Sequence, residues 1–212
     1  MLLLSHFVGR FLPNLTCVDK DDTVESRKYH PVGIDLHIAA GELVLVSGPV
    51  ACGKSTLLQS LVGNTEQLGG KLEVPASVAF QPQSPILFDQ TIRANILFGI
   101  SDAATDEAAL QEALVSSTLS MDMDDPESTL HEKREQTGCG QGGSELSGGQ
   151  QARVALARCM YAALAGGSEA VILDGGLSLV DTHPVTVALL RSFASTCRWL
   201  TCAIGLCNAK QA

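Results

Sequence analysis

The feature that most constrains the fold is an apolar run at residues 43–46 that leads directly into a glycine-containing turn. Continuous apolar character predicts a strand that is buried on both faces, as in the centre of a parallel sheet. Beyond the turn, leucine and valine recur on one side of a predicted helix that spans residues 55–62 and ends at Gly63. Upstream, apolar residues alternate over 32–38, which predicts another strand. This order of elements predicts an α/β fold.

The composition supports a single domain of this class. Of the 212 residues, 45% are hydrophobic but only 4% are aromatic, and 20 are glycine. A core built mainly from Leu, Val, Ile and Ala is typical of a parallel sheet covered by helices, so the composition favours an α/β fold over a β-sandwich. A second large domain is not expected at this length.

The turn itself, residues 48–55 (GPVACGKS), matches the pattern G-x-x-x-x-G-K-[ST] at every fixed position. It lies between a strand and a helix, as that phosphate-binding loop (Walker A) requires. Its glycines let backbone N–H groups converge on phosphate oxygens, and the helix N-terminus adds positive potential. Ser55 is expected to ligate magnesium as well. The residues predicted to bind phosphate are Gly48, Gly53, Lys54, Ser55 and Thr56.

Charge and cysteine content argue against two other classes of function. Lys and Arg number 14 against 23 Asp and Glu, a formal charge of −9, which leaves no broad basic face, so no nucleic-acid partner is expected. The seven cysteines include no CxxC pair, which favours reduced thiols in the cytosol. Cys197, Cys202 and Cys207 lack metal-finger spacing and a nearby histidine, so we expect no metal site there.

The N-terminal residues 1–13 are apolar but include His6 and Arg10. They are too few for a membrane-spanning helix, which needs about 20 residues. They also lack the positive start and the small-residue cleavage site of a signal peptide. We therefore expect no transmembrane segment in this chain, and any attachment to a membrane would come through a partner.

Three further elements are predicted downstream. Residues 101–135 carry alanine and leucine at helical spacing among acidic residues, which predicts helices that lie apart from the sheet. Residues 138–149 contain six glycines, which is typical of a flexible loop, and a helix is predicted over 150–164. Residues 170–173 predict a short buried strand that ends in Asp174.

Residues 146–150 (LSGGQ), followed by QARVALAR, resemble the signature motif and signature helix of ABC (ATP-binding cassette) ATPases. Ser147 is a good N-cap, and two glycines allow bare backbone amides to face an anion at a helix N-terminus. The resemblance implies a P-loop NTPase of ABC type, in which a mainly parallel sheet with flanking helices carries a small helical subdomain. It also implies that the motif serves the γ-phosphate held by a second, facing ABC nucleotide-binding domain. The residues that would act in trans are Ser147, Gly148, Gly149 and Gln150.

Other segments resemble further motifs of this family. Residues 78–83 and 91–99 resemble the Q-loop segment, in which Gln83 would contact magnesium and couple the nucleotide site to a transmembrane domain. Asp174 would hold magnesium through water at the end of the Walker B strand. The implied cofactors are ATP and Mg²⁺. The residues implied around the metal are Ser55, Gln83 and Asp174.

Details of these segments resemble the first nucleotide-binding domain of the multidrug-resistance-associated (C subfamily) ABC transporters. These details include Gly-Pro-Val in the phosphate loop, the short spacing from Lys54 to Gln83, and residues 95–99 (NILFG) and 177–181 (LSLVD). The resemblance covers about residues 33–181. It implies a domain on the cytoplasmic side of a membrane, peripheral through the transmembrane domain of an exporter, and that absent domain would choose the substrate.

Three positions depart from the family pattern. The residue after the Walker B aspartate is Gly175, where active members have a glutamate that deprotonates the attacking water, so general-base catalysis is expected to be lost. The switch histidine would lie near 200–206, but no histidine follows His183. Cys17 occupies the slot of the adenine-stacking aromatic residue, for which Tyr29 is the alternative. Whether the chain hydrolyses ATP is therefore left open.

These observations divide one ABC cassette into four parts. The leading hypothesis is a domain that binds Mg-ATP to drive or regulate transmembrane export. The alternatives are a catalytically impaired nucleotide-sensing or interaction module and a degenerate gene fragment. The predicted parts are a linker and N-terminal strand region (1–30), a nucleotide-binding core with Walker A and Q-loop (31–100), a helical subdomain with the signature helix (101–165), and a Walker B, D-loop and truncated C-terminal part (166–212).

Overall fold

The computed structural model describes residues 15–19, 30–34, 37–39, 43–48, 53–101, 104–174 and 201–207. Two sheets form in these ranges, and the predicted α/β class with a parallel sheet is confirmed. The parallel sheet has the order β3 (Leu43–Gly48), β7 (Thr201–Cys207), β6 (Ala170–Leu173), β5 (Val78–Gln81). The antiparallel sheet has the order β2 (His30–Ile34), β1 (Leu15–Asp19), β4 (Thr65–Gly69).

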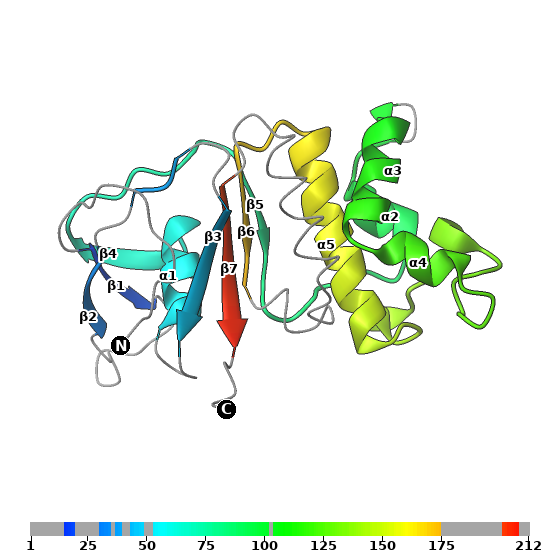
Figure 1. Cartoon of the computed structure of the whole chain (residues 1–212), viewed down its shortest axis with the longest axis horizontal. Helices are drawn as coiled ribbons and strands as arrows, with labels where there is room; N and C mark the ends of the chain where they lie inside the picture. Colours follow the sequence, from blue (N-terminus) through cyan, green and yellow to red (C-terminus); the bar gives the residue numbers. More distant parts are fainter. Residues whose placement is uncertain are drawn as a thin grey trace.

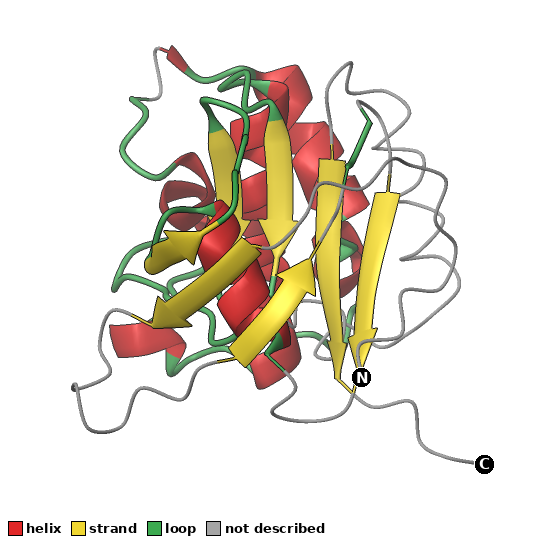
Figure 2. Cartoon of the chain, turned by 90° about the vertical axis from the view of Figure 1, so that its left-hand side faces the viewer, coloured by secondary structure: helices red, strands yellow, loops and turns green. Residues whose placement is uncertain are grey.

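Helix α1 (Lys54–Leu61) lies between the two sheets, in contact with β1 and β4 on one side and with β3 and β7 on the other (Figure 1). Figure 2 shows that the strands of the two sheets run in clearly different directions. The helix ends as predicted at Gly63, whose φ of +75° favours glycine. Gly63 and Asn64 donate backbone hydrogen bonds back to Ser60 (3.1 Å) and Gln59 (3.0 Å), which is a Schellman motif.

Helix α5 (Gly148–Leu164) covers the opposite face of the parallel sheet, where it contacts β5 and β6. Side chains of β6 alternate between the two faces. Val171 and Leu173 join the cluster beneath α5, whereas Ile172 packs with Leu58 of α1. Because helices cover both faces, all four residues of β6 are buried, and the predicted strand at 170–173 is confirmed.

Three shorter helices pack against α5 on the side away from the sheet (Figure 1). They are α2 (Ile92–Leu97), α3 (Glu107–Ser116) and α4 (Leu119–Asp124). Asp106 caps α3 by accepting a hydrogen bond from the Ala109 N–H at 3.0 Å, and the Tyr161 hydroxyl of α5 accepts from the Asp106 N–H at 3.2 Å. The helices expected within 101–135 are therefore present. None of the described helices has the length and hydropathy that a bilayer crossing requires.

The glycine-rich stretch before α5 is more regular than predicted. The short 3₁₀ turn η3 (Gln141–Gly143) lies inside the stretch, and another 3₁₀ turn, η2 (Arg134–Gln136), lies just before it. A Cβ atom at Gly143 would come within 3.0 Å of Leu87 and 3.1 Å of Gln151, so glycine permits this close approach. Helix α5 begins at Gly148, two residues before the predicted start at 150, because Ser147 caps it.

Candidate functional site

The predicted phosphate loop joins the carboxyl end of β3 to the start of α1, although residues 49–52 lie outside the described ranges. Gly53 is the N-cap residue of α1, with φ +95°, and it provides no side-chain cap. The first backbone hydrogen bond of the helix runs from Leu57 to Gly53 at 2.9 Å, so the Ser55 and Thr56 amides precede the intrahelical ladder. A helix N-terminus without a side-chain cap is suited to bind an anion.

Ser55 and Asp174 meet beside this helix start. The Ser55 hydroxyl donates a hydrogen bond to Asp174 Oδ1 at 3.0 Å, which joins the first turn of α1 to the end of β6. Asp174 is only 5% exposed, and its backbone N–H donates to the Gln81 carbonyl at 2.9 Å, which extends the pairing of β5 and β6. A hydroxyl and a carboxylate at this separation are oxygen ligands of the kind that Mg²⁺ binds.

Burial controls the acidity of the Asp174 carboxyl. Desolvation raises the pKa of Asp174, while the hydrogen bond from Ser55 and the attraction of Lys54 lower this pKa to a smaller extent. A buried carboxylate gains stability when a metal ion binds to it. The residues present therefore fit a magnesium ion held next to phosphate.

The third predicted metal ligand, Gln83, makes no hydrogen bond to this pair in the described part of the chain. Gln83 is exposed beyond the end of β5. Gln81, two residues earlier, is instead 1% exposed, and its Oε1 atom has no hydrogen-bond partner. Across the described part of the chain, no group of three or more His, Cys, Asp or Glu residues is arranged to hold a metal ion by itself.

The predicted signature residues form the N-terminus of α5. Ser147 and Gln150 make a capping box, in which the Gln150 N–H donates to the Ser147 hydroxyl at 3.3 Å and the Ser147 N–H donates to Gln150 Oε1 at 2.9 Å. Gly148 occupies the first helical position, and a Cβ atom there would meet nothing within 4 Å. At Gly149 a Cβ atom would come within 3.3 Å of the Arg153 guanidinium. The first two residues of α5 are therefore glycines, whose backbone N–H groups have no side chain of their own residue beside them.

Several predicted positions lie wholly or partly outside the described residues. Tyr29, Gly175 and His183 lie outside the described residues, and of Cys17 only the backbone in β1 is described, paired with His30 and Gln67. The stretch in which a switch histidine was expected largely coincides with β7, which lies between β3 and β6. The adenine contact and the general-base position therefore stay predictions.

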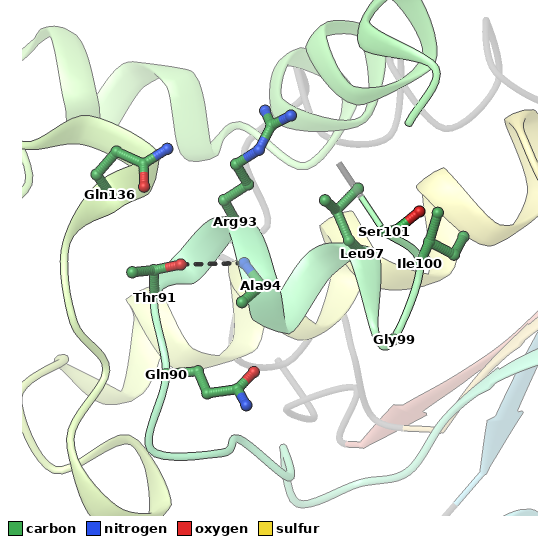
Figure 3. Close-up of a pocket in the computed structure, with 9 residues that line it drawn as sticks. All are labelled: Gln90, Thr91, Arg93, Ala94, Leu97, Gly99, Ile100, Ser101 and Gln136. Atoms are coloured by element: carbon green, nitrogen blue, oxygen red, sulfur yellow. Dashed lines mark hydrogen bonds between the residues drawn. The ribbon is translucent and has the colours of Figure 1, made fainter. Parts of the chain in front are cut away.

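A groove of about 520 Å³ runs along α2, and no sequence motif predicts it (Figure 3). One face of α2 forms its floor, where the Thr91 hydroxyl accepts a hydrogen bond from the Ala94 N–H at 3.1 Å and Leu97 lies one turn further. Gln136 lines it from the neighbouring η2 turn. None of the lining residues is a predicted ATP or magnesium ligand.

Comparisons with known proteins identify relatives of this chain. The profile of the ABC transporter family matches residues 32–174. The chain is similar to human ATP-binding cassette sub-family C member 3, with 37% identity over 150 residues that cover 71% of this chain and 9% of the relative. It is similar, with the same identity and coverage, to multidrug resistance protein mrp-7 of Caenorhabditis elegans. The chain thus spans a small part of the length of these curated relatives.

A solved structure shares the fold. It is described as a bacterial Atm1-family ABC exporter with ATP bound, and it aligns with a TM-score of 0.69 and 25% sequence identity. The alignment covers 94% of this chain and 35% of the solved one.

Proposed function

Because this chain belongs to the ABC transporter family and its matched residues form an ATP-binding domain of that family, we propose that it binds Mg-ATP as the nucleotide-binding part of a C-subfamily-like exporter. The observation that carries the proposal is the Ser55–Asp174 hydrogen bond of 3.0 Å beside the start of α1. It joins the two oxygen ligands of a magnesium site to a helix N-terminus that has no side-chain cap. A bound nucleoside triphosphate needs both a magnesium site and a helix N-terminus that is open to its phosphates.

Each residue of the proposed site has a distinct task. Gly48 and Gly53 would let the backbone approach the phosphates, the Ser55 and Thr56 amides would donate hydrogen bonds, and Lys54 would reach the terminal phosphates. Ser55 and Asp174 would hold Mg²⁺, which neutralises charge on the phosphate oxygens, and Gln83 would join them when nucleotide is bound.

Hydrolysis is the weaker part of the proposed activity. Gly175 has no carboxylate to accept the proton of an attacking water, and no histidine follows His183 in the sequence. A module that senses nucleotide, or that assists the active site of a partner, is therefore the second candidate. It shares the Mg-ATP site with the first candidate and differs only in turnover.

We propose a second ABC nucleotide-binding domain as the partner of the signature residues. Helices α1 and α5 cover opposite faces of the parallel sheet, which supports a signature turn that serves the phosphate loop of another domain. The glycine amides at the start of α5 would bind the partner's γ-phosphate, with Ser147 and Gln150 fixing the turn.

We also propose a transmembrane domain as a partner, which would place this chain on the cytoplasmic side of a membrane. Phe98 and Phe88 are 60% and 44% exposed, and Ile86 is exposed beside them. These apolar side chains follow Gln83 in sequence, and the α2 groove lies nearby on the same segment. Exposed apolar groups of this kind support contact with another protein surface.

Calorimetry tests the nucleotide site. Lys54→Ala should abolish Mg-ATP binding, because the loop loses its phosphate-binding cation. Lys71→Ala is the matched control, since Lys71 is exposed and pairs with Glu73 outside the loop, and it should bind like wild type. Equal affinity in Lys54→Ala and wild type, or no binding by a demonstrably folded wild type, would contradict the assignment.

Sedimentation tests the proposed partner domain. The chain is mixed with a complementary cassette with and without Mg-ATP, and nucleotide should promote association. Ser147→Arg should prevent it by adding bulk and positive charge to the helix N-terminus. Thr129→Arg, at an exposed position outside the signature motif and α5, is the control and should associate normally. Association that is equal in every condition would show that any dimer uses another surface.

A further inference from the structure

Arg158 of α5 binds a segment that lies 63 and 72 positions away in the chain. Its guanidinium donates from Nε to the Asn95 carbonyl at 2.7 Å, from Nη1 to the Ile86 carbonyl at 2.9 Å, and from Nη2 to Asn95 Oδ1 at 3.1 Å. All three acceptors are uncharged. Burial lowers the pKa of Arg158, and within the described ranges it forms no ion pair with a carboxylate. Because the guanidinium group is planar and its N–H groups point in fixed directions, these three hydrogen bonds fix the position of the Ile86 and Asn95 backbone relative to α5.

Asn95 is the centre of this contact and is itself buried. Its amide nitrogen donates to the carbonyls of Phe88 (3.0 Å) and Thr91 (3.1 Å), and to the Cys139 sulfur at 3.3 Å. Its Oδ1 accepts from the Phe88 N–H at 2.9 Å. Asn95 therefore ties α2 to the preceding segment and to the loop that leads to the signature residues.

Two aromatic rings complete the contact. The Arg158 guanidinium lies 5.0 Å from the ring centre of Phe98 and 5.8 Å from that of Phe88, within cation–π range. Phe98 has φ +46°, a conformation that bulky residues rarely adopt. Because the ring is mostly exposed, its position depends on Arg158 and Phe88 rather than on burial in the core.

We infer that Arg158 is a positioning residue that joins residues 86–98 to the signature helix, so that a change at Gln83 is carried to Ser147. The segment begins three residues after Gln83 and is bonded to α5 at Arg158. From there the helix runs without interruption to its cap at Ser147, about 16 Å away at 1.5 Å per residue. This inference rests on the proposed nucleotide site, since it assigns Gln83 to that site.

Hydrogen exchange of the whole chain tests the inference, with Arg158→Lys compared with Arg153→Lys. Lysine keeps the charge but cannot make three forked hydrogen bonds. Arg153 is the matched control because it lies on the same helix and bonds to both oxygens of Asp122 in α4, not to residues 86–98. Without nucleotide, amides of residues 86–98 should exchange about tenfold faster in Arg158→Lys, because the Ile86 and Asn95 carbonyls lose a charged donor and the segment opens more readily. Their exchange should be unchanged in Arg153→Lys.

With Mg-ATP, exchange at Gln150 and Gln151 should change in wild type and in Arg153→Lys, whereas Arg158→Lys should bind nucleotide without that response. A response that survives in Arg158→Lys, or a similar loss in both variants, would overturn the inference. Uniformly faster exchange along α5, with an equal fall in Tm for both variants, would show a role in stability alone. Failure of wild type to bind Mg-ATP in calorimetry would instead overturn the proposed function, and the nucleotide-free comparison would still report on the Arg158 contact.

Discussion

Replacing Asp174 with asparagine should stabilise the nucleotide-free protein and remove most of the stabilisation that Mg-ATP provides. Asp174 is 5% exposed, and the Ser55 hydroxyl donates a hydrogen bond to its carboxylate. Ionising it inside the protein costs more than ionising it in the unfolded chain, because burial outweighs the hydrogen bond from Ser55 and the attraction of Lys54. Asparagine has nearly the same shape and can accept the same hydrogen bond without carrying a charge.

The sign of the pH dependence follows from the direction of this shift. The pKa of Asp174 is raised in the folded state, so its contribution to stability is fully present below the unfolded pKa of about 4 and is lost as pH rises through the higher folded pKa. The advantage of Asp174→Asn should therefore be largest at pH 7 and should shrink as the pH falls towards the unfolded pKa.

Mg-ATP should reverse the order of the two proteins. Nucleotide at about 100 times its Kd stabilises a protein that binds it only when folded by about 2.7 kcal/mol, or roughly 5 to 11 °C in Tm for a chain of this size. Wild type should show this rise. Asp174→Asn should show little of it, since a neutral amide is a poor ligand for magnesium.

Thermal unfolding at pH 7, with and without Mg-ATP, measures both effects. Asp122→Asn is the control. Asp122 is not a residue of the proposed site, and it accepts two hydrogen bonds from Arg153, of 2.6 and 2.9 Å. The control variant should be less stable than wild type without nucleotide and should gain the full increase with it. A lower Tm for nucleotide-free Asp174→Asn than for wild type, or an undiminished gain with Mg-ATP, would refute the reasoning.

Three other predictions concern turnover and the signature helix. Phosphate release by the isolated chain should stay near background, because a positioned general base supplies about 10²–10⁴-fold and Gly175 provides none; steady turnover that depends on the phosphate loop would contradict this. Ser147→Ala should cost about 1 kcal/mol in denaturant unfolding, because the Gln150 N–H loses its cap, and unchanged stability would show that the capping box is dispensable. Tyr161→Phe should cost about 1 kcal/mol, because the Asp106 N–H loses its acceptor, and an unchanged midpoint would show that water replaces the hydroxyl.

Local sequence signals predicted the elements whose structure is determined by residues within one short segment. The apolar residues 43–46, the glycine–lysine loop and the leucines beyond it gave β3 and α1 to within one residue at each end of the helix. Ser147 was recognised as an N-cap, yet the helix was predicted to start at 150. Glycine propensity argued against helix at 148 and 149, and the capping box outweighed it.

Pairings between distant segments could not be predicted in the same way. Strand β4 (TEQLG) has no apolar alternation, and it exists because β1 pairs with it across some 50 residues of chain. Strand β7 was not expected. It lies between β3, which precedes the phosphate loop, and β6, which ends at Asp174, and no local motif marks residues 201–207 as the strand between them. In the sequence, Arg158 is a polar residue on a predicted helix, and nothing near it indicates its hydrogen bonds to Ile86 and Asn95, which only the folded structure shows.

The place of β7 has a consequence for how the protein is made. Leu43 of β3 pairs with Cys202 of β7, so the strand that leads into the phosphate loop is translated long before its neighbour. At about 5–20 residues per second, the apolar strand β3 waits for roughly 8 to 30 s on the ribosome before β7 can pair with it. Chaperones that bind extended apolar chain have that interval in which to engage it, and β3 and β6 are joined through β7 only after β7 has emerged from the exit tunnel.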